Sequence, residues 1–263
     1  MNKNKVLFCL GILFLILPFG LKYADGKRQQ NFVATYELEV ENVDRSKLTE
    51  CMEEAELYNE ELYKYDRFNN EVYEEQLNLF GNGVKGSIEI PKINLKLPIY
   101  HGTEEEILTN GIGHLKESSL PVAGVNVHSI LTGHRGLPEA ELFTRLDELE
   151  KEDVFFLNIC DKKHTYVVCD VQVVRPEDVE ILEIQPEKSL VSLVTCTPYG
   201  INTHRLVVTG AYQEEIEIEE TEIEVNTFSK RDIFFVALPV GLLAIGIVRY
   251  VRKRGERNET RKC

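Results

Sequence analysis

The stretch LVTCTPYGINTHRL, residues 193–206, combines the pattern of a buried strand with polar residues that can react. It begins as an apolar strand, ends that strand at Cys196, turns through Pro-Tyr-Gly and returns through His204 and Arg205. Reacting groups are usually displayed where a regular element gives way to a loop, whereas a structural cysteine fits better in the middle of a buried strand. The stretch therefore predicts a pair of strands that presents Cys196 at its edge.

Short apolar segments bounded by turn residues surround this pair. They are rich in Val, Ile, Leu, Phe and Thr and lie at residues 87–102, 129–133, 153–160, 164–174, 189–196 and 204–212. Such segments are typical of β-strands. One helical pattern, residues 139–149, interrupts them. We therefore predict a mostly β domain at residues 81–215, a closed antiparallel β-barrel with short helices.

Residues 31–80 have a different character. Apolar residues recur there at intervals of three and four, at Leu48, Met52, Ala55, Tyr58 and Leu62. This spacing predicts an amphipathic helix, and residues 69–80 predict a second, short one. The run GNGVKG, residues 81–86, then breaks the pattern. The β domain therefore carries a helical N-terminal extension.

Charge is distributed unevenly along the 263 residues, whose net charge is −14. Residues 1–5 and 249–263 together hold nine basic and two acidic residues, so the stretch between them holds the remaining 21 basic and 42 acidic ones. This acidic balance argues against nucleic acid as a partner.

Each basic end adjoins an apolar run, at residues 6–21 and 233–248. We expect a transmembrane helix or signal-anchor at 6–22 and a second transmembrane helix at 233–248, joined to the β domain by an acidic connector, residues 216–232. A cleaved signal peptide and a buried core helix are the respective alternatives. The positive-inside rule then places the head (1–5) and the tail (249–263) in the cytoplasm and the catalytic domain outside the cell membrane.

Four cysteines belong to the outside portion, because Cys9 lies in the first apolar run and Cys263 at the tail. Cys160 and Cys169 flank a segment that resembles a hairpin turn, so they could form a disulfide or remain as two buried thiols. No partner is evident for Cys196, which keeps a reactive role open for it.

A cysteine nucleophile needs a group that handles protons and a donor for developing negative charge. The chain has six histidines: His101, His114, His128, His134, His164 and His204. His134 follows a predicted strand in SILTGHRG, at an edge like that of Cys196. His204 and Arg205 are consecutive on a strand, so only one of them faces the cysteine. Arg205 is always charged and suits an oxyanion better than a second imidazole would.

The segments LVTCTPYGINTHRL and LTGHRGLP resemble the cysteine and histidine motifs of the sortases, with the arginine on the next strand. The segments YEEQLNLFGNGVKGSIEIPKINLKLPIYHG and GIGHLKESSLPV, and the helical extension, are similar to class C, the pilin-polymerising sortases. The resemblance covers residues 58–212. It implies a sortase-type barrel that needs no cofactor or metal, with Cys196, His134 and Arg205 as catalytic residues.

The resemblance also implies the reaction. A membrane-anchored sortase cleaves a Leu-Pro-x-Thr-Gly-like sorting signal of a surface protein or pilin between Thr and Gly and forms a thioacyl enzyme. A class C enzyme passes the acyl group to an acceptor lysine of a pilin and so builds covalent pili, whereas a housekeeping sortase anchors it to peptidoglycan. A papain-like protease is disfavoured because Cys196 ends a strand. A non-enzymatic membrane-tethered adhesin has no reason to display a reactive cysteine.

Class C sortases often carry a lid whose Asp-Pro-aromatic motif covers the groove. This chain has no Asp-Pro, and the nearest match is YDRFNN, in which Arg67 replaces the proline. Asp66 and Phe68 are therefore the candidate lid residues, with an ordinary loop between two helices as the alternative.

Overall fold

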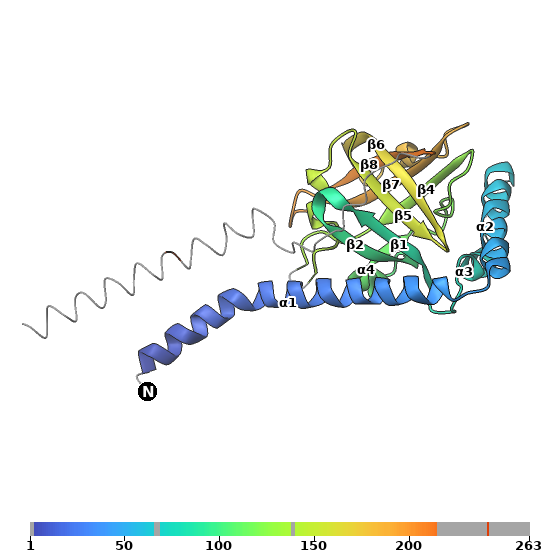
Figure 1. Cartoon of the computed structure of the whole chain (residues 1–263). Helices are drawn as coiled ribbons and strands as arrows, with labels where there is room; N and C mark the ends of the chain where they lie inside the picture. Colours follow the sequence, from blue (N-terminus) through green and yellow to red (C-terminus); the bar gives the residue numbers. More distant parts are fainter. Residues whose placement is uncertain (1–2, 66–68, 138–139, 215–240, 242–263) are drawn as a thin grey trace, which may run out of the picture. The chain divides into compact units, whose positions relative to one another are not determined.

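The structure, a computed structural model, describes residues 3–65, 69–137, 140–214 and 241. A closed β-barrel follows a set of helices in the chain (Figure 1). By its internal contacts the chain divides into two units, and the barrel and most of the helical extension lie in the unit formed by residues 18–225.

Eight strands form the barrel. They are β1 (Val84–Ile90), β2 (Leu95–His101), β3 (Ile112–His114), β4 (Val127–Thr132), β5 (Val154–Ile159), β6 (Lys162–Val174), β7 (Ser189–Thr197) and β8 (His204–Gln213). Their order around the barrel is β1-β2-β3-β4-β7-β8-β6-β5, and β5 closes onto β1. The predicted mostly β closed barrel is thus confirmed.

Most strand pairs are antiparallel, as we expected, but two are not. The pairs β2–β3 and β4–β7 are parallel. A parallel pair needs a crossover connection rather than a tight turn. The helix α4 (Glu105–Asn110) lies in the first crossover, and β5 and β6 belong to the second. The second crossover makes β4 and β7 neighbours although they are far apart in sequence.

The helical pattern at residues 139–149 forms a 3₁₀ segment, η2 (Leu142–Glu148), instead of an α-helix. Leu142 has a positive φ of 40°, and Phe143 leaves helical values at φ −87° and ψ 23°. Both side chains are buried, so packing against the barrel takes precedence over helix propensity here. Two further 3₁₀ turns, η1 (Pro91–Ile93) and η3 (Val179–Leu182), join strands.

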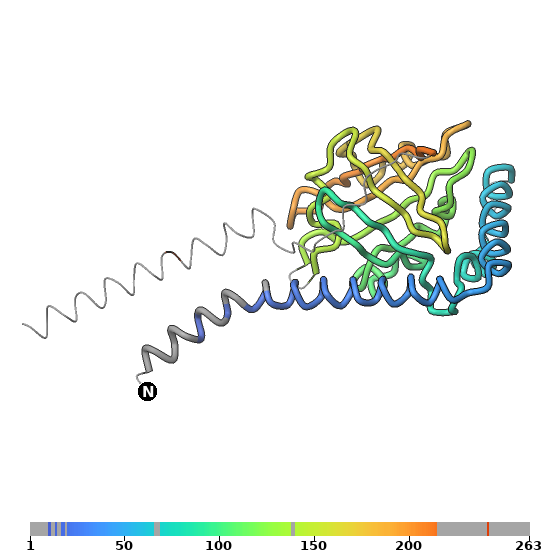
Figure 2. The backbone as a smooth tube through the Cα atoms, viewed as in Figure 1, coloured from blue at the N-terminus to red at the C-terminus, as the bar shows by residue number. Residues whose placement is uncertain are grey.

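The helical extension consists of α1 (Lys3–Glu41), α2 (Arg45–Tyr65) and α3 (Asn70–Glu75). All five residues of the predicted apolar stripe are buried on α2, which confirms the amphipathic helix. The chain changes direction sharply between α1 and α2 (Figure 2). α1 begins well before residue 31, where we expected the extension to start, and continues through Pro18.

The extension contacts the barrel through hydrogen bonds as well as apolar packing. Asn59 of α2 is buried; its amide donates to the Leu120 carbonyl at 3.1 Å and its oxygen accepts from the Leu120 N–H at 2.7 Å. On α1, Glu37 pairs with Lys96 of β2 at 2.7 Å. This amide fixes the position of α2, because a shift of the helix would leave the buried Leu120 N–H and the Asn59 side chain unpaired.

Within the described residues, no helix combines the length and the apolar character that a membrane crossing requires. The acidic connector lies outside the described residues, and so does the second apolar run except for Gly241.

Replacement of Asn59 by alanine tests how α2 is held. Asn59→Ala leaves the buried N–H of Leu120 without its partner, at about 1–3 kcal/mol for an unsatisfied group, while the Leu120 carbonyl still accepts from the Val122 N–H at 2.8 Å. We expect the free energy of unfolding, measured by urea titration, to fall by about 1–3 kcal/mol. The matched control is Glu60→Ala on the next, exposed position, where only a surface pair with Lys64 is lost. Equal effects of the two changes would contradict this role of Asn59.

Candidate active site

The register of β7 and β8 places Cys196 directly opposite Arg205. Residues opposite each other in an antiparallel pair project to the same face of the sheet, with Cβ atoms about 4.5–5.5 Å apart. His204 pairs with Thr197 and therefore lies on the other face. The structure thus brings Cys196 and Arg205 together, as the sequence predicts, and turns His204 away from them.

His134 reaches the same face from the neighbouring strand. The last paired residues of β4 and β7 are Thr132 and Val194, and these strands run parallel. Two further residues on each chain lead to His134 and Cys196, so continuation of the register sets them side by side. Both residues are half-buried. The ends of three strands, β4, β7 and β8, thus carry the three predicted residues to one place.

Three hydrogen bonds hold the backbone around His134. The Gly133 N–H donates to the Val194 carbonyl at 3.2 Å, and the hydroxyl of Thr195 donates to the Gly133 carbonyl at 2.7 Å. The Phe143 N–H donates to the His134 carbonyl at 3.1 Å. A Cβ at position 133 would lie 2.9 Å from the Phe143 ring, so the glycine before His134 permits this packing. The imidazole therefore stands on a rigid support.

The imidazole of His134 has a carboxylate partner. Its Nε2 lies 3.1 Å from Oε1 of Glu105, the first residue of α4. An ionised carboxylate can only accept a hydrogen bond, so Nε2 donates to Glu105, and Nδ1 remains available to exchange a proton with a substrate. Glu105 is largely exposed, with 79% of its side chain accessible, and such a contact orients the ring more than it stabilises the fold.

The guanidinium of Arg205 is held by carbonyl oxygens of its own loop. Nη1 donates to Asn202 at 3.3 Å and to His204 at 3.1 Å. Among the residues that the structure describes, no carboxylate forms an ion pair with it. Its charge is therefore still available to an anionic group beside Cys196.

Arg135 is a residue of this site that the sequence analysis did not identify. Nη1 donates to the Thr197 hydroxyl at 2.9 Å, and Nη2 pairs with Asp147 of η2 at 2.8 Å. Only 5% of the side chain is accessible. Arg135 thus connects the loop after β4 to the residue that follows Cys196. Its position next to His134 in sequence was the only available signal.

Four other histidines are buried and have a structural role. They are His101, His114, His128 and His164. His114 contacts the Tyr73 hydroxyl and the Ser119 carbonyl, and burial lowers its pKa well below the ordinary value. His128 contacts Ser192 and the Glu183 carbonyl. Because their ring nitrogens are occupied, His114 and His128 are not free to exchange protons with a substrate.

The expectation for Cys160 and Cys169 needs correction. Cys160 lies in the β5–β6 turn, whereas Cys169 is within β6, at a bulge between Val168 and Asp170, and is exposed. The predicted hairpin between the two is in fact part of one long strand. Both are free thiols, and only Cys160 is buried.

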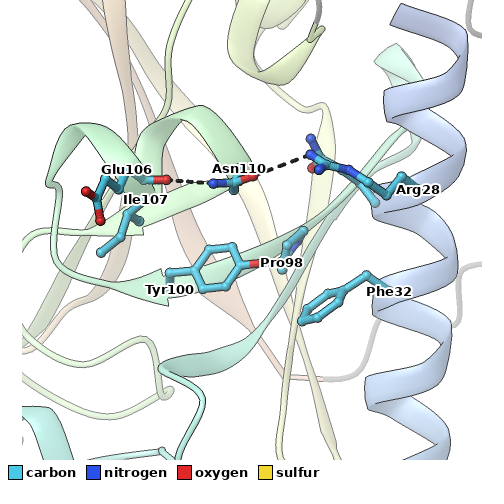
Figure 3. Close-up of a pocket in the computed structure, with 8 residues that line it drawn as sticks. Arg28, Phe32, Pro98, Tyr100, Glu106, Ile107 and Asn110 are labelled. Carbon is cyan, nitrogen blue, oxygen red and sulfur yellow. Dashed lines mark hydrogen bonds between the residues drawn. The ribbon is translucent and has the colours of Figure 1, made fainter. Parts of the chain in front are cut away.

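A pocket of about 300 Å³ lies between α1, β2 and α4 (Figure 3). Phe32 and Tyr100 face each other across it, with ring centroids 6.3 Å apart. Arg28 and Asn110 bridge its rim at 3.4 Å. None of the three predicted catalytic residues lines it, so it belongs to the seam between extension and barrel.

The candidate lid residues Asp66 and Phe68 lie outside the described residues. Within the described ranges, no three His, Cys, Asp or Glu side chains are arranged to hold a metal ion.

Comparison with known proteins agrees with this geometry. A family model described as the sortase domain matches residues 88–213, from β1 to β8. A solved structure, sortase C1 of Streptococcus agalactiae, is 41% identical, with 71% of this chain and 100% of that one covered and a TM-score of 0.68. The chain belongs to the sortase family, whose members are cysteine transpeptidases.

Other proteins similar to this chain are also sortases. Sortase C of Streptococcus pneumoniae, a protein with pilin substrate specificity, is 38% identical, with 70% of this chain and 97% of that one covered and a TM-score of 0.65. Sortase D of Bacillus subtilis is 39% identical over 115 residues, which are 44% of this chain. The match spans only 55% of that curated relative.

Arg135→Met tests whether Arg135 stabilises the loops around the candidate site through its bonds to Thr197 and Asp147. Methionine keeps much of the volume but loses the charged hydrogen bonds to Thr197 and Asp147. We expect the free energy of unfolding, measured by urea titration, to fall by about 1–3 kcal/mol. The control is Arg175→Met, at an exposed position, with a change below about 0.5 kcal/mol. If both variants were as stable as the wild type, Arg135 would not provide this support.

Proposed function

We propose that this sortase cleaves a Leu-Pro-x-Thr-Gly-like sorting signal between Thr and Gly and transfers the threonyl group to a lysine of a pilin. The placement of Cys196 beside both His134 and Arg205 carries this proposal. Cys196 is the nucleophile, His134 the group that handles protons and Arg205 the group that binds the oxyanion.

Acylation uses each residue once. The Cys196 thiolate attacks the threonine carbonyl carbon, and the carbonyl oxygen becomes an oxyanion beside the Arg205 guanidinium. The intermediate collapses, the C–N bond to glycine breaks, and the departing amine takes a proton from the imidazolium of His134. A thioester on Cys196 remains. A fixed cation at the developing charge lowers the barrier because it needs no reorganisation.

Transfer is the reverse with another amine. The lysine nitrogen attacks the thioester carbon, His134 accepts a proton from this nitrogen, and the sulfur leaves as the thiolate. An isopeptide bond forms and the enzyme is regenerated. Glu105 orients the His134 ring through Nε2 during both steps.

Two observations favour pilin polymerisation over anchoring to peptidoglycan. The similarity to sortase C1 of Streptococcus agalactiae covers that chain fully, and a second similar structure is a sortase with pilin substrate specificity. This chain also carries α2 and α3 packed against the barrel through buried contacts, and this helical extension is part of its resemblance to the class C, pilin-polymerising sortases. The housekeeping alternative has a different acceptor amine and is distinguished by the product.

The acceptor test uses the purified chain with a pilin that bears the sorting signal. A pilin-polymerising enzyme produces a covalent ladder that survives boiling in detergent, and pilin with its acceptor lysine changed to arginine gives none. If only peptidoglycan-like amines, and no pilin lysine, were accepted, the enzyme would be of the housekeeping type.

Substitutions test the catalytic assignment. Cys196→Ala should abolish release of the glycine fragment from a sorting-signal peptide, and His134→Ala and Arg205→Ala should each lower kcat/KM on the order of 10²-fold or more. His204→Ala is the matched control because this residue lies on the opposite face, and it should cost much less. An inactive His204→Ala together with an active His134→Ala would overturn the choice of histidine.

We also propose that the domain lies outside the cell membrane with both termini in the cytoplasm. The motivation is the basic residues on the outer flank of each apolar run. Protease added to intact protoplasts should digest the middle of the chain and spare tags at both ends. Removal of the C-terminal tag from outside would contradict this topology.

A further inference from the structure

Two thiols from distant parts of the chain meet between the extension and the barrel. The Cys160 thiol lies 3.8 Å from the sulfur of Cys51, and the two residues are 109 positions apart. Cys51 belongs to α2, and Cys160 to the turn between β5 and β6. Cys160 is buried and Cys51 half-buried, so a small molecule can reach the pair from the side of Cys51.

The backbone at Cys160 has a conformation that is uncommon for a cysteine. The turn has two residues, because Ile159 and Lys162 still pair across it. Cys160 is the first of the two and has a φ of 52°. Turns of this length favour glycine or asparagine at such a position, since a side chain costs about 1–2 kcal/mol in the left-handed region. The contact with Cys51 offsets part of this cost.

The pair is also chemically unequal. The hydrogen bond from Cys160 lowers the pKa of the Cys51 thiol, and the same bond together with burial raises the pKa of Cys160. The half-buried Cys51 therefore reacts first, because the thiolate is the nucleophile.

We propose that Cys51 and Cys160 form a redox site whose disulfide staples α2 of the extension to the β5–β6 turn of the barrel. The oxidant is a disulfide, either of a small molecule or of a thiol–disulfide oxidoreductase. The Cys51 thiolate attacks it, a mixed disulfide forms and one thiol leaves. The Cys160 thiolate then attacks the Cys51 sulfur and releases the second thiol. Two protein thiols are oxidised and one external disulfide is reduced.

This staple is remote from the catalytic residues. Arg205 pairs with Val174 at one end of β6, whereas the Cys160 turn precedes the other end. The 13 residues of β6 separate the two ends by about 40 Å. Oxidation of the pair therefore leaves Cys196 free. The proposal needs an outside location of the domain only for oxidation in the cell, so the purified chain tests it independently of the proposed function.

The test compares the full chain, purified in a non-ionic detergent, after incubation with oxidised or with reduced glutathione. Peptide mapping by mass spectrometry without reduction should find the Cys51 and Cys160 peptides joined, with the loss of two hydrogen atoms. The thermal midpoint of the oxidised chain should exceed that of the reduced chain by roughly 5–15 °C, as for a disulfide that closes a long loop.

Cys51→Ser should abolish both the joined peptide and the difference in midpoint, while Cys169→Ser should retain both. The proposal is overturned if Cys51 and Cys160 stay unlinked, or carry only separate glutathione adducts, under conditions that modify the exposed Cys169. A joined peptide with equal midpoints would also contradict it, because the bond would then not act as a staple. The comparison of oxidised with reduced wild type depends on no variant.

Discussion

The site depends on the register of three strands. β7 lies between β4 and β8, parallel to β4 and antiparallel to β8. The residues at the end of β7 lie beside residues of both neighbouring strands. Because side chains alternate along a strand, a slip of one residue would turn Cys196 inward and carry Thr195 out of the core. Thr195 is buried and donates to the Gly133 carbonyl, so such a slip would lose this bond and bury the proposed nucleophile, Cys196. The packing that fixes the barrel thereby also fixes the chemistry.

Much of the site geometry could be predicted from the sequence because it depends on local structure. The opposite orientation of His204 and Arg205 follows from the pleat, and the place of Cys196 at a strand end follows from the run of apolar residues before it. His134 was identifiable because it also ends a strand. What the sequence did not reveal depends on distant contacts: the parallel neighbours β4 and β7, the buried bridge made by Arg135, and the approach of Cys51 to Cys160. The periodicity of apolar residues predicts a helix but does not indicate which distant turn that helix will contact.

The extension is part of the folded domain and not an appendage. Tyr73 of α3 is buried, and its hydroxyl lies 2.9 Å from His114 and accepts from the Gly102 N–H at 3.0 Å. Lys85 of β1 is fully buried, donates to the Gln76 carbonyl and lies over the Tyr73 ring. Buried polar groups are tolerated only when they are paired, so the helices and strands must assemble together. This explains why several buried histidines are structural and leaves His134 as the half-buried one beside Cys196.

The proposed reaction depends on acylation of Cys196 by a sorting signal. This acylation can be detected by mixing the chain with a Leu-Pro-x-Thr-Gly peptide, quenching in acid and mapping the protein by mass spectrometry. We predict a mass increase equal to the acyl fragment ending in threonine, located on Cys196, sensitive to hydroxylamine and absent from Cys196→Ala. A peptide that is cleaved at the same rate by Cys196→Ala, or an acyl group found on another residue, would contradict it.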